Sequence, residues 1–84
     1  MREVIVYSRR GCHLCEVMLQ KAEPLCRGLA EIIVRDVDTQ AEWADRYGLD
    51  VPVLILDGAE VCRHEFDDEA FLAALQGAKA QPGP

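Results

Sequence analysis

Short, continuous apolar runs mark the strands of this chain. Apolar residues are consecutive within three segments, residues 3–8, 31–37 and 50–56. Runs of this kind are typical of strands that are covered on both faces, because a strand with one solvated face alternates apolar and polar residues. The pattern therefore predicts three strands of a sheet with helices on both sides.

A longer segment after Cys12 has helical spacing instead. Its apolar stripe, at intervals of three and four, consists of Leu14, Val17, Met18, Ala22, Leu25 and Leu29. This spacing predicts a helix with one face against the core. Pro24 lies inside the stripe, so we expect a kink near residues 20–21 or a break and restart. Gly28 is expected to end the helix.

A second helix is predicted to begin near Thr39. Thr39 and Glu42 fit a capping box, in which each side chain bonds the backbone N–H of the other residue. Trp43 and Tyr47 lie four positions apart and share one face, and Gly48 is expected to end the helix.

The last elements are a hairpin and a third helix. Asp57-Gly58 is a strong hairpin signal because both residues accept positive φ, so residues 59–64 should return as an antiparallel fourth strand. Asp67 can cap a final helix, with Phe66 and Phe71 packed across the cap. The core-facing residues of this helix are expected to be Phe71, Leu72 and Leu75.

The predicted order is β-α-β-α-β-β-α. Because a helix joins the first two strands, they should be parallel with a right-handed crossover. The fold class is therefore α/β, with a mixed four-stranded sheet and helices on both faces. A chain of 84 residues is expected to form one domain, residues 1–77, followed by a flexible C-terminal tail, residues 78–84.

Composition narrows the classes of function. The chain is 50% hydrophobic and 29% charged, which is typical of a soluble globular domain, and its net charge of −6 disfavours nucleic acid and anionic membrane surfaces. Residues 1–10 do not have the pattern of a signal peptide, and no apolar run approaches the roughly 20 residues that cross a bilayer. We therefore expect a cytoplasmic protein, monomeric and without a membrane partner.

The candidate chemistry lies in Cys12 and Cys15, at the start of the first predicted helix. Residues at i and i+3 of a helix are about 5–6 Å apart, which suits a reversible disulfide. The helix N-terminus favours a thiolate, so Cys12 is predicted to be the nucleophile and Cys15, one turn deeper, the resolving thiol. Arg9, Arg10 and His13 add positive charge, and His13 is either a proton shuttle or a solvated turn residue.

Other interpretations of the cysteines remain open at this point. A CxxC pair can be half of a zinc site, or two inert packing residues. The strand–turn–helix context favours a redox pair, because zinc knuckles usually place CxxC on a tight hairpin turn. Cys62 and His64 could complete a zinc set, but their strand is expected at the sheet edge, away from the pair, so no metal site is predicted. Cys26 and Cys62 are interpreted as packing residues.

The chain resembles the glutaredoxins and small glutaredoxin-like proteins of the thioredoxin-like superfamily. The segments that carry the resemblance are residues 6–15, residues 50–53 and Asp67-Asp68. The resemblance implies a thiol–disulfide oxidoreductase that reduces protein or glutathione-type disulfides. It also implies no bound cofactor, glutathione as a candidate co-substrate, and glutathione or a thioredoxin system as the thiol reductant.

The resemblance also implies a set of substrate-binding residues. A cis peptide bond before Pro52 would leave the Val51 backbone free to pair with an extended substrate. Arg9 matches the basic position that holds glutathione, and Tyr7 matches a residue that borders the substrate. Asp67-Asp68 match the helix start that binds a carboxylate.

Two departures from the family pattern bear on glutathione. His64-Glu65-Phe66 stands where glutaredoxins usually carry Gly-Gly, and an acidic, bulky residue there is expected to crowd and repel the tripeptide. His13-Leu14 replaces the usual Pro-Tyr between the cysteines. The alternative function is a non-enzymatic thioredoxin-fold module that binds a partner, a metal or an iron–sulfur centre through the CxxC loop. A cluster of the glutaredoxin type normally relies on bound glutathione, so the same departures count against it.

Overall fold

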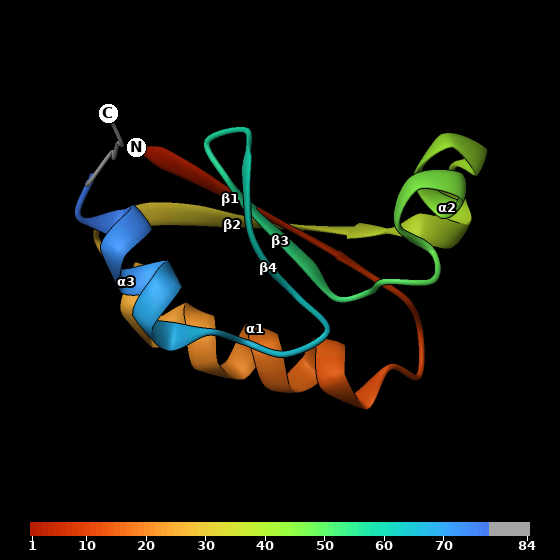
Figure 1. Ribbon diagram of the computed structural model, residues 1–84, viewed down its shortest axis with the longest axis horizontal. Coiled ribbons are helices and arrows are strands. Elements are labelled where there is room, and N and C mark those ends of the chain that lie inside the picture. The colour runs from red at the N-terminus through yellow and green to blue at the C-terminus, as the bar shows by residue number, and fades with distance from the viewer. Residues whose placement is uncertain (78–84) are drawn as a thin grey trace.

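The computed structural model describes residues 1–77, so the predicted flexible tail, residues 78–84, lies outside the described residues. The elements, in chain order, are β1 (Arg2–Ser8), α1 (His13–Cys26), β2 (Ala30–Asp36), the 3-10 turn η1 (Val37–Thr39), α2 (Ala41–Tyr47), β3 (Val53–Leu56), β4 (Ala59–Arg63) and α3 (Asp68–Leu75). This is the predicted order with η1 added between β2 and α2 (Figure 1).

The four strands form one mixed sheet in the order β2-β1-β3-β4. β1 is parallel to β2, while β3 is antiparallel to both β1 and β4. The predicted hairpin is confirmed, since Asp57 and Gly58 have φ values of 50° and 89° between β3 and β4. The parallel pairing of β1 and β2, which the connecting helix predicted, is confirmed as well.

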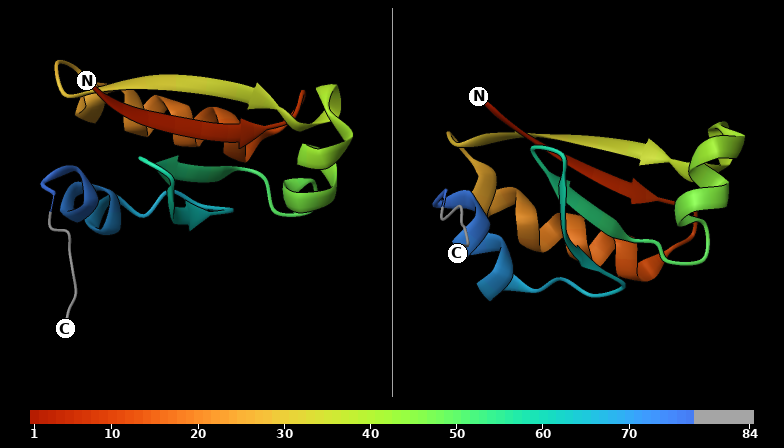
Figure 2. Two further views of the ribbon diagram at one scale, coloured as in Figure 1. Left: turned by 90° about the horizontal axis from the view of Figure 1, so that it is seen from above. Right: turned by 45° about the horizontal axis from the view of Figure 1, so that its top comes forward.

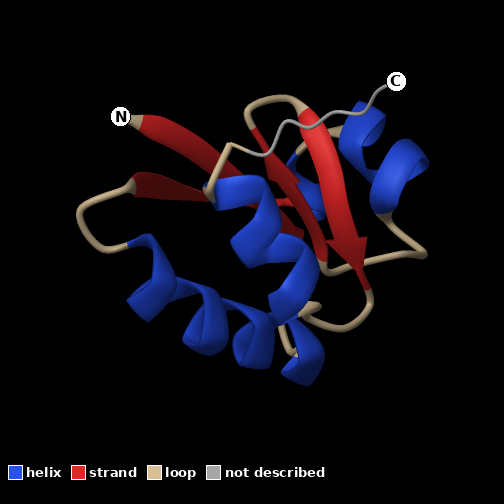
Figure 3. Ribbon diagram, turned by 60° about the vertical axis from the view of Figure 1, so that its left-hand side comes forward, coloured by secondary structure: helices blue, strands red, loops and turns tan. Residues whose placement is uncertain are grey.

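One face of the sheet packs against α1 and α3. Val4 and Val6 of β1 point to this face and are fully buried with Met18 of α1 and Phe71 of α3. Two views show both helices on the same side of the sheet (Figures 2 and 3). This cluster is the larger of the two core clusters and fixes α1 against the sheet.

The opposite face is covered at one end by α2. Tyr7 of β1 stacks on Tyr47 at a ring-centroid distance of 4.1 Å and meets the edge of Trp43 at 5.7 Å. Val37 and Val53 are fully buried in the same cluster. The predicted shared face of Trp43 and Tyr47 is therefore confirmed, and the sheet has helices on both faces.

α1 differs from its predicted stripe at both ends. Its buried residues are Cys15, Met18, Ala22 and Cys26. Leu14 and Leu29 are 47% and 56% exposed, so their predicted core positions are wrong. Leu14 lies in the exposed first turn, and Leu29 lies beyond the end of the helix. α1 also runs through Pro24 without the predicted break, because Pro24 removes only one backbone bond and the helix ends two residues later.

The start of α2 also differs from the prediction. Thr39 belongs to η1, and its hydroxyl donates to the Asp36 carbonyl at 2.7 Å. The N-cap of α2 is Gln40, whose side chain makes no capping hydrogen bond. The predicted capping box is therefore wrong, because the chain completes a separate 3-10 turn before α2 begins.

α3 begins as predicted. The Asp67 carboxylate accepts the Ala70 N–H at 3.0 Å, and the rings of Phe66 and Phe71 pack at 5.3 Å. Leu72, which was expected in the core, is 40% exposed. Among the helices within residues 1–77, none has the length and apolar character needed to cross a bilayer.

The cap of α3 gives a first prediction. Asp67→Ala should lower the free energy of unfolding by about 1 kcal/mol, because the Ala70 N–H loses its acceptor. Urea unfolding followed by circular dichroism measures the change. Asp67→Asn is the matched control, since the amide oxygen can accept the same hydrogen bond. An alanine variant as stable as the parent protein would contradict a capping role.

Candidate active site

The two cysteines lie on a tight turn that becomes the first turn of α1. Gly11 has φ +72°, and the Cys12 N–H then donates to the Arg9 carbonyl at 3.3 Å. Cys12 is the N-cap of α1, and its Sγ accepts the Cys15 N–H at 3.1 Å. The turn therefore aims a backbone donor at the Cys12 sulfur.

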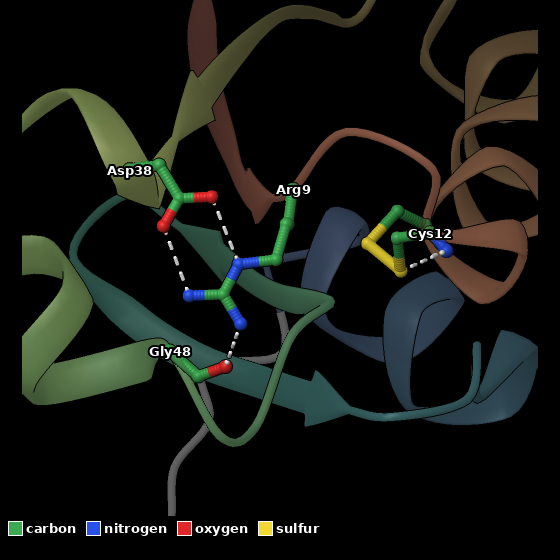
Figure 4. Close-up of a disulfide and its surroundings, with 5 residues drawn as sticks. Arg9, Cys12, Asp38 and Gly48 are labelled. Atoms are coloured by element: carbon green, nitrogen blue, oxygen red, sulfur yellow. Dashed lines mark hydrogen bonds and ion pairs between the residues drawn. A yellow bond between two sulfur atoms is a disulfide. The ribbon is translucent and has the colours of Figure 1, made fainter.

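Cys12 and Cys15 are joined by a disulfide, with their Cα atoms 5.2 Å apart (Figure 4). This separation lies in the range expected from the i, i+3 spacing. Cys12 is partly exposed, whereas Cys15 is 2% exposed. The two sulfurs therefore differ in access from solvent, as the predicted roles require.

The two remaining cysteines lie in the core or at its edge. Cys26 is 2% exposed, and Cys62 is partly buried against the α1–α3 cluster. Burial raises the pKa of the Cys26 thiol, as does the nearby Glu23 carboxylate to a lesser extent. Burial likewise raises the pKa of the Cys62 thiol. Both thiols are therefore poor nucleophiles near neutral pH, which agrees with their interpretation as packing residues.

Arg9 makes three hydrogen bonds inside the protein. Its Nε and Nη2 donate to the two carboxylate oxygens of Asp38 at 2.9 and 3.0 Å, and its Nη1 donates to the Gly48 carbonyl at 3.0 Å (Figure 4). The Arg9 hydrogen bonds hold the pKa of Asp38 below its usual value. The basic group that the sequence predicted for glutathione is thus already engaged within the chain.

The contact with Gly48 depends on the absence of a side chain. A Cβ at this buried position would overlap the Ala44 carbonyl oxygen and lie 3.3 Å from Arg9 Nη2. Gly48 has φ −56°, so the requirement is for space rather than for a left-handed backbone. Glycine here allows the end of α2 to approach the arginine.

The peptide bond between Val51 and Pro52 is cis, as the resemblance implied. Tyr7 pairs with Val53, so Pro52 follows in register beside Ser8, the last residue of β1 before the cysteine turn. Pro52 is buried and Val51 is partly exposed. Val51 precedes the paired residues of β3, so its backbone lies outside the sheet pairing.

The turn after β4 is attached to the same loop. The His64 N–H donates to the Pro52 carbonyl at 2.8 Å, and His64 Nε2 lies 3.4 Å from the Asp50 carboxylate. Arg63 forms an ion pair with Asp50 at 2.9 Å. His64 has φ +71°, a backbone conformation that glycine adopts easily. His64, which lies in the segment that replaces Gly-Gly, and Arg63 therefore hold the Pro52 loop from the β4 side.

The other predicted site residues lie around these groups. Tyr7 is 6% exposed, and its hydroxyl accepts a hydrogen bond from Arg35 at 2.9 Å, so little of its surface is left for a substrate. Asp67 caps α3. Asp68 lines a hollow of about 300 Å³ with Lys21, Leu25 and Phe66. Substrate contacts of Tyr7, Asp67 and Asp68 stay predictions.

A larger hollow, of about 510 Å³, lies between α3 and the start of β4, next to the turn that joins β3 and β4. Its lining includes Leu56, Val61, Ala70 and Ala74, none of which is a predicted site residue. Within residues 1–77, the His, Cys, Asp and Glu side chains form no group of three or more that could hold a metal ion.

The sequence interpretation missed the partners of Arg9, namely Asp38 and Gly48. A signal for Asp38 was present, because the carboxyl ends of two parallel strands meet at one edge of a sheet. Arg9 follows β1 and Asp38 follows β2, and the register pairs Ser8 with Asp36. No comparable sequence signal marks Gly48, whose carbonyl is brought to Arg9 by the packing of α2.

Comparison with known proteins places this site in context. Residues 3–76 match the model of the glutaredoxin-like domain (DUF836). A structural genomics target protein from X. campestris is 32% identical, with a TM-score of 0.70 over 89% of this chain and 97% of that one. A search of curated proteins gave no match.

Thioredoxins are similar as well. A mutant thioredoxin from Halobacterium salinarum is 26% identical, with a TM-score of 0.62 over 99% of this chain and 78% of that one. Fasciola hepatica thioredoxin is 25% identical, with a TM-score of 0.60 over 93% of this chain and 81% of that one. The thioredoxin-like fold and the CxxC pair together support a redox-type function.

Proposed function

Because the chain belongs to the glutaredoxin-like domain family (DUF836), we propose that it is a thiol–disulfide oxidoreductase whose reacting groups are Cys12 and Cys15. One observation carries the proposal. Cys12, a partly exposed residue at the N-cap of α1, is joined by a disulfide to the buried residue Cys15 one turn below.

In the reduced protein, the Cys12 thiolate attacks one sulfur of a substrate disulfide. A bond forms between Cys12 Sγ and that sulfur, the substrate S–S bond breaks, and the other substrate sulfur leaves as a thiolate that takes a proton from water. The Cys15 N–H lies 3.1 Å from Cys12 Sγ, and the N-terminus of α1 favours negative charge. Both features stabilise the attacking thiolate.

In the second step, the Cys15 thiolate attacks Cys12 Sγ of the mixed disulfide. The bond between the two cysteines forms, and the remaining substrate thiolate leaves. The substrate has then gained two electrons and the protein has lost two. A thiol reductant, either glutathione or a thioredoxin system, returns the pair to the dithiol.

The substrates that we propose are disulfides of proteins or small molecules. The Val51 backbone, outside the sheet pairing beside the buried Pro52, is the edge on which an extended substrate would lie. We propose that the protein acts as a monomer in the cytoplasm, without a bound cofactor. Glutathione enters only as a candidate co-substrate.

A titration against mixtures of reduced and oxidised glutathione tests this function. Samples are trapped with acid and read by intact mass, and we expect an internal Cys12–Cys15 disulfide to form and reopen reversibly. A variant with both Cys26 and Cys62 replaced by alanine should give the same midpoint, because neither thiol takes part. If no internal disulfide forms at any ratio, the oxidoreductase proposal is wrong and the metal-binding or partner-binding alternative takes its place.

A further inference from the structure

Arg9 connects three segments that are distant in the sequence. Its main-chain carbonyl accepts the Cys12 N–H at 3.3 Å, so Arg9 belongs to the cysteine turn. Its guanidinium reaches Asp38 in η1 and the carbonyl of Gly48 at the end of α2. Gly48 begins the short connection that leads to Val51 and Pro52.

We propose that Arg9 is a positioning residue that holds the Pro52 loop against the cysteine turn, and that it is not a ligand of a substrate carboxylate. The proposal rests on the proposed function for its effect on disulfide reduction. The contacts themselves do not depend on that function.

The arrangement of donors supports the first half of the proposal. A guanidinium is a planar fork, and here its Nε, Nη1 and Nη2 are all engaged, two with one carboxylate and one with a backbone carbonyl. Asp38 is itself fixed, because its N–H donates to the Asp36 carboxylate at 2.9 Å. The Gly48 N–H donates to Ala44, and the Asp50 N–H donates to Tyr47. Arg9 therefore joins two segments that already have local order.

The charge around Arg9 supports the second half. Asp38 pairs with the guanidinium in a bidentate ion pair, and Asp36 also acts on it electrostatically. Three of the five N–H donors of Arg9 are engaged, so a carboxylate from a substrate would have to displace Asp38 or share the guanidinium with it. Glu65 follows His64, whose N–H bonds the Pro52 carbonyl, so the turn beside the Pro52 loop carries a further negative charge that makes an anionic substrate less favourable.

The expected effect of this contact is on the geometry of attack. A substrate on the Val51 backbone must present its sulfur in line with the Cys12 thiolate. Displacing reacting atoms by about 1 Å can slow a reaction by as much as 10²-fold. Arg9 contacts Cys12 through its main chain and Gly48 through its side chain. Loss of its side-chain contacts should therefore slow the reaction with every disulfide, whatever the charge of that disulfide.

The test compares two disulfides, one neutral, bis(2-hydroxyethyl) disulfide, and one anionic, oxidised glutathione. Acid quenching and intact mass give the rate at which reduced protein reacts with each. The variants are Arg9→Gln, Arg9→Lys and Asp38→Asn, with Arg27→Gln as the control for loss of one positive charge, because Arg27 is 73% exposed and lies at the opposite end of α1 from the cysteines. Thermal unfolding checks that each variant is folded.

We expect Arg9→Gln and Asp38→Asn each to slow both disulfides about tenfold, since the first removes the guanidinium and the second removes the carboxylate that orients it toward the Gly48 carbonyl. Arg9→Lys should also be slow, because a lysine ammonium cannot replace the planar fork. The double variant Arg9→Gln with Asp38→Asn should react no more slowly than either single variant, as expected for two partners of one interaction. Arg27→Gln should change the rates by less than about twofold, because an exposed charge at the far end of α1 is screened from the cysteines.

A carboxylate ligand would behave differently. The proposal is overturned if Arg9→Gln slows only oxidised glutathione while Asp38→Asn leaves both rates unchanged or raises the glutathione rate. It is also overturned if Arg9→Lys reacts like the parent protein, because charge alone would then be sufficient.

Hydrogen exchange separates failure of this proposal from failure of the proposed function. In Arg9→Gln, the amides of Gly48 and Asp50 should exchange faster, while amides of β1 such as Ile5 keep their rate. If the parent protein reacts with neither disulfide, but the Gly48 and Asp50 amides exchange faster in Arg9→Gln, the proposed function is wrong and the positioning role of Arg9 stands. Unchanged exchange of the Gly48 and Asp50 amides would refute the positioning role of Arg9.

Discussion

Replacing Cys12 with serine should abolish the proposed disulfide reduction, with a loss of at least about 10³-fold, because the hydroxyl is neither ionised nor nucleophilic enough to attack a disulfide. Replacing Cys15 with serine has a different result. The Cys12 thiolate still attacks, but nothing resolves the intermediate, so a mixed disulfide accumulates on Cys12. Intact-mass analysis after acid quenching, with bis(2-hydroxyethyl) disulfide as the substrate, distinguishes the two outcomes.

The control for both variants is the replacement of Cys26 and Cys62 by alanine. Burial raises the pKa of both thiols, so their removal should leave the rate of the first step unchanged. Full activity in Cys12→Ser would refute the assignment of the nucleophile. An adduct on Cys12→Ser, at Cys15, would instead mean that the buried sulfur is accessible and that the two roles are reversed.

The second large effect is on stability. Phe71→Ala should lower the free energy of unfolding by about 3–5 kcal/mol, the usual cost of removing a buried aromatic ring. Phe71 is fully buried and is the largest of the fully buried side chains. It packs against Phe66 and joins α3 to the cluster formed by β1, β3 and α1. Because small domains have only about 5–15 kcal/mol of stability in total, this variant should be close to unfolding at room temperature.

Urea unfolding gives the change, with Leu72→Ala as the matched control. Leu72 is the next residue on α3 and is 40% exposed, so its truncation should cost less than about 1 kcal/mol. Equal destabilisation by the two variants would mean that α3 is held by its overall helical propensity rather than by one buried ring.

Much of the fold was predictable because its signals are local. Continuous apolar runs predicted β1, β2 and β3, Asp57-Gly58 predicted the hairpin, and Asp67 predicted the start of α3. The errors lie where a local pattern does not determine the surroundings. Spacing assigned Leu14 and Leu29 to the buried face of α1, but it does not show that the first turn is exposed at Leu14 or that the helix ends at Cys26, before Leu29. Thr39 and Glu42 have the spacing of a capping box, yet Thr39 lies in a 3-10 turn, where its hydroxyl bonds the Asp36 carbonyl.

The candidate site shows the same difference between features that are local in the sequence and contacts between distant residues. The Cys12–Cys15 spacing and the Val51-Pro52 dipeptide are visible in a few adjacent residues. The partners of Arg9 are 29 and 39 positions away, so their contact depends on strand register and on the packing of α2. The resemblance predicts that Arg9 binds glutathione, and this stays a prediction. A family pattern records the residue type at a position and not the contacts that it makes in one chain, so it did not indicate Asp38 and Gly48.

The aromatic cluster under α2 has a practical consequence. Trp43 is the single tryptophan of the chain. It contacts the ring of Tyr7 on β1 and the guanidinium of Arg35 on β2, whose central carbon is 5.1 Å from the Trp43 ring centroid. The tryptophan fluorescence of the protein is therefore sensitive to the contact between α2 and the sheet. Emission spectra can report whether α2 separates from the sheet while the rest of the domain stays folded, without any added label.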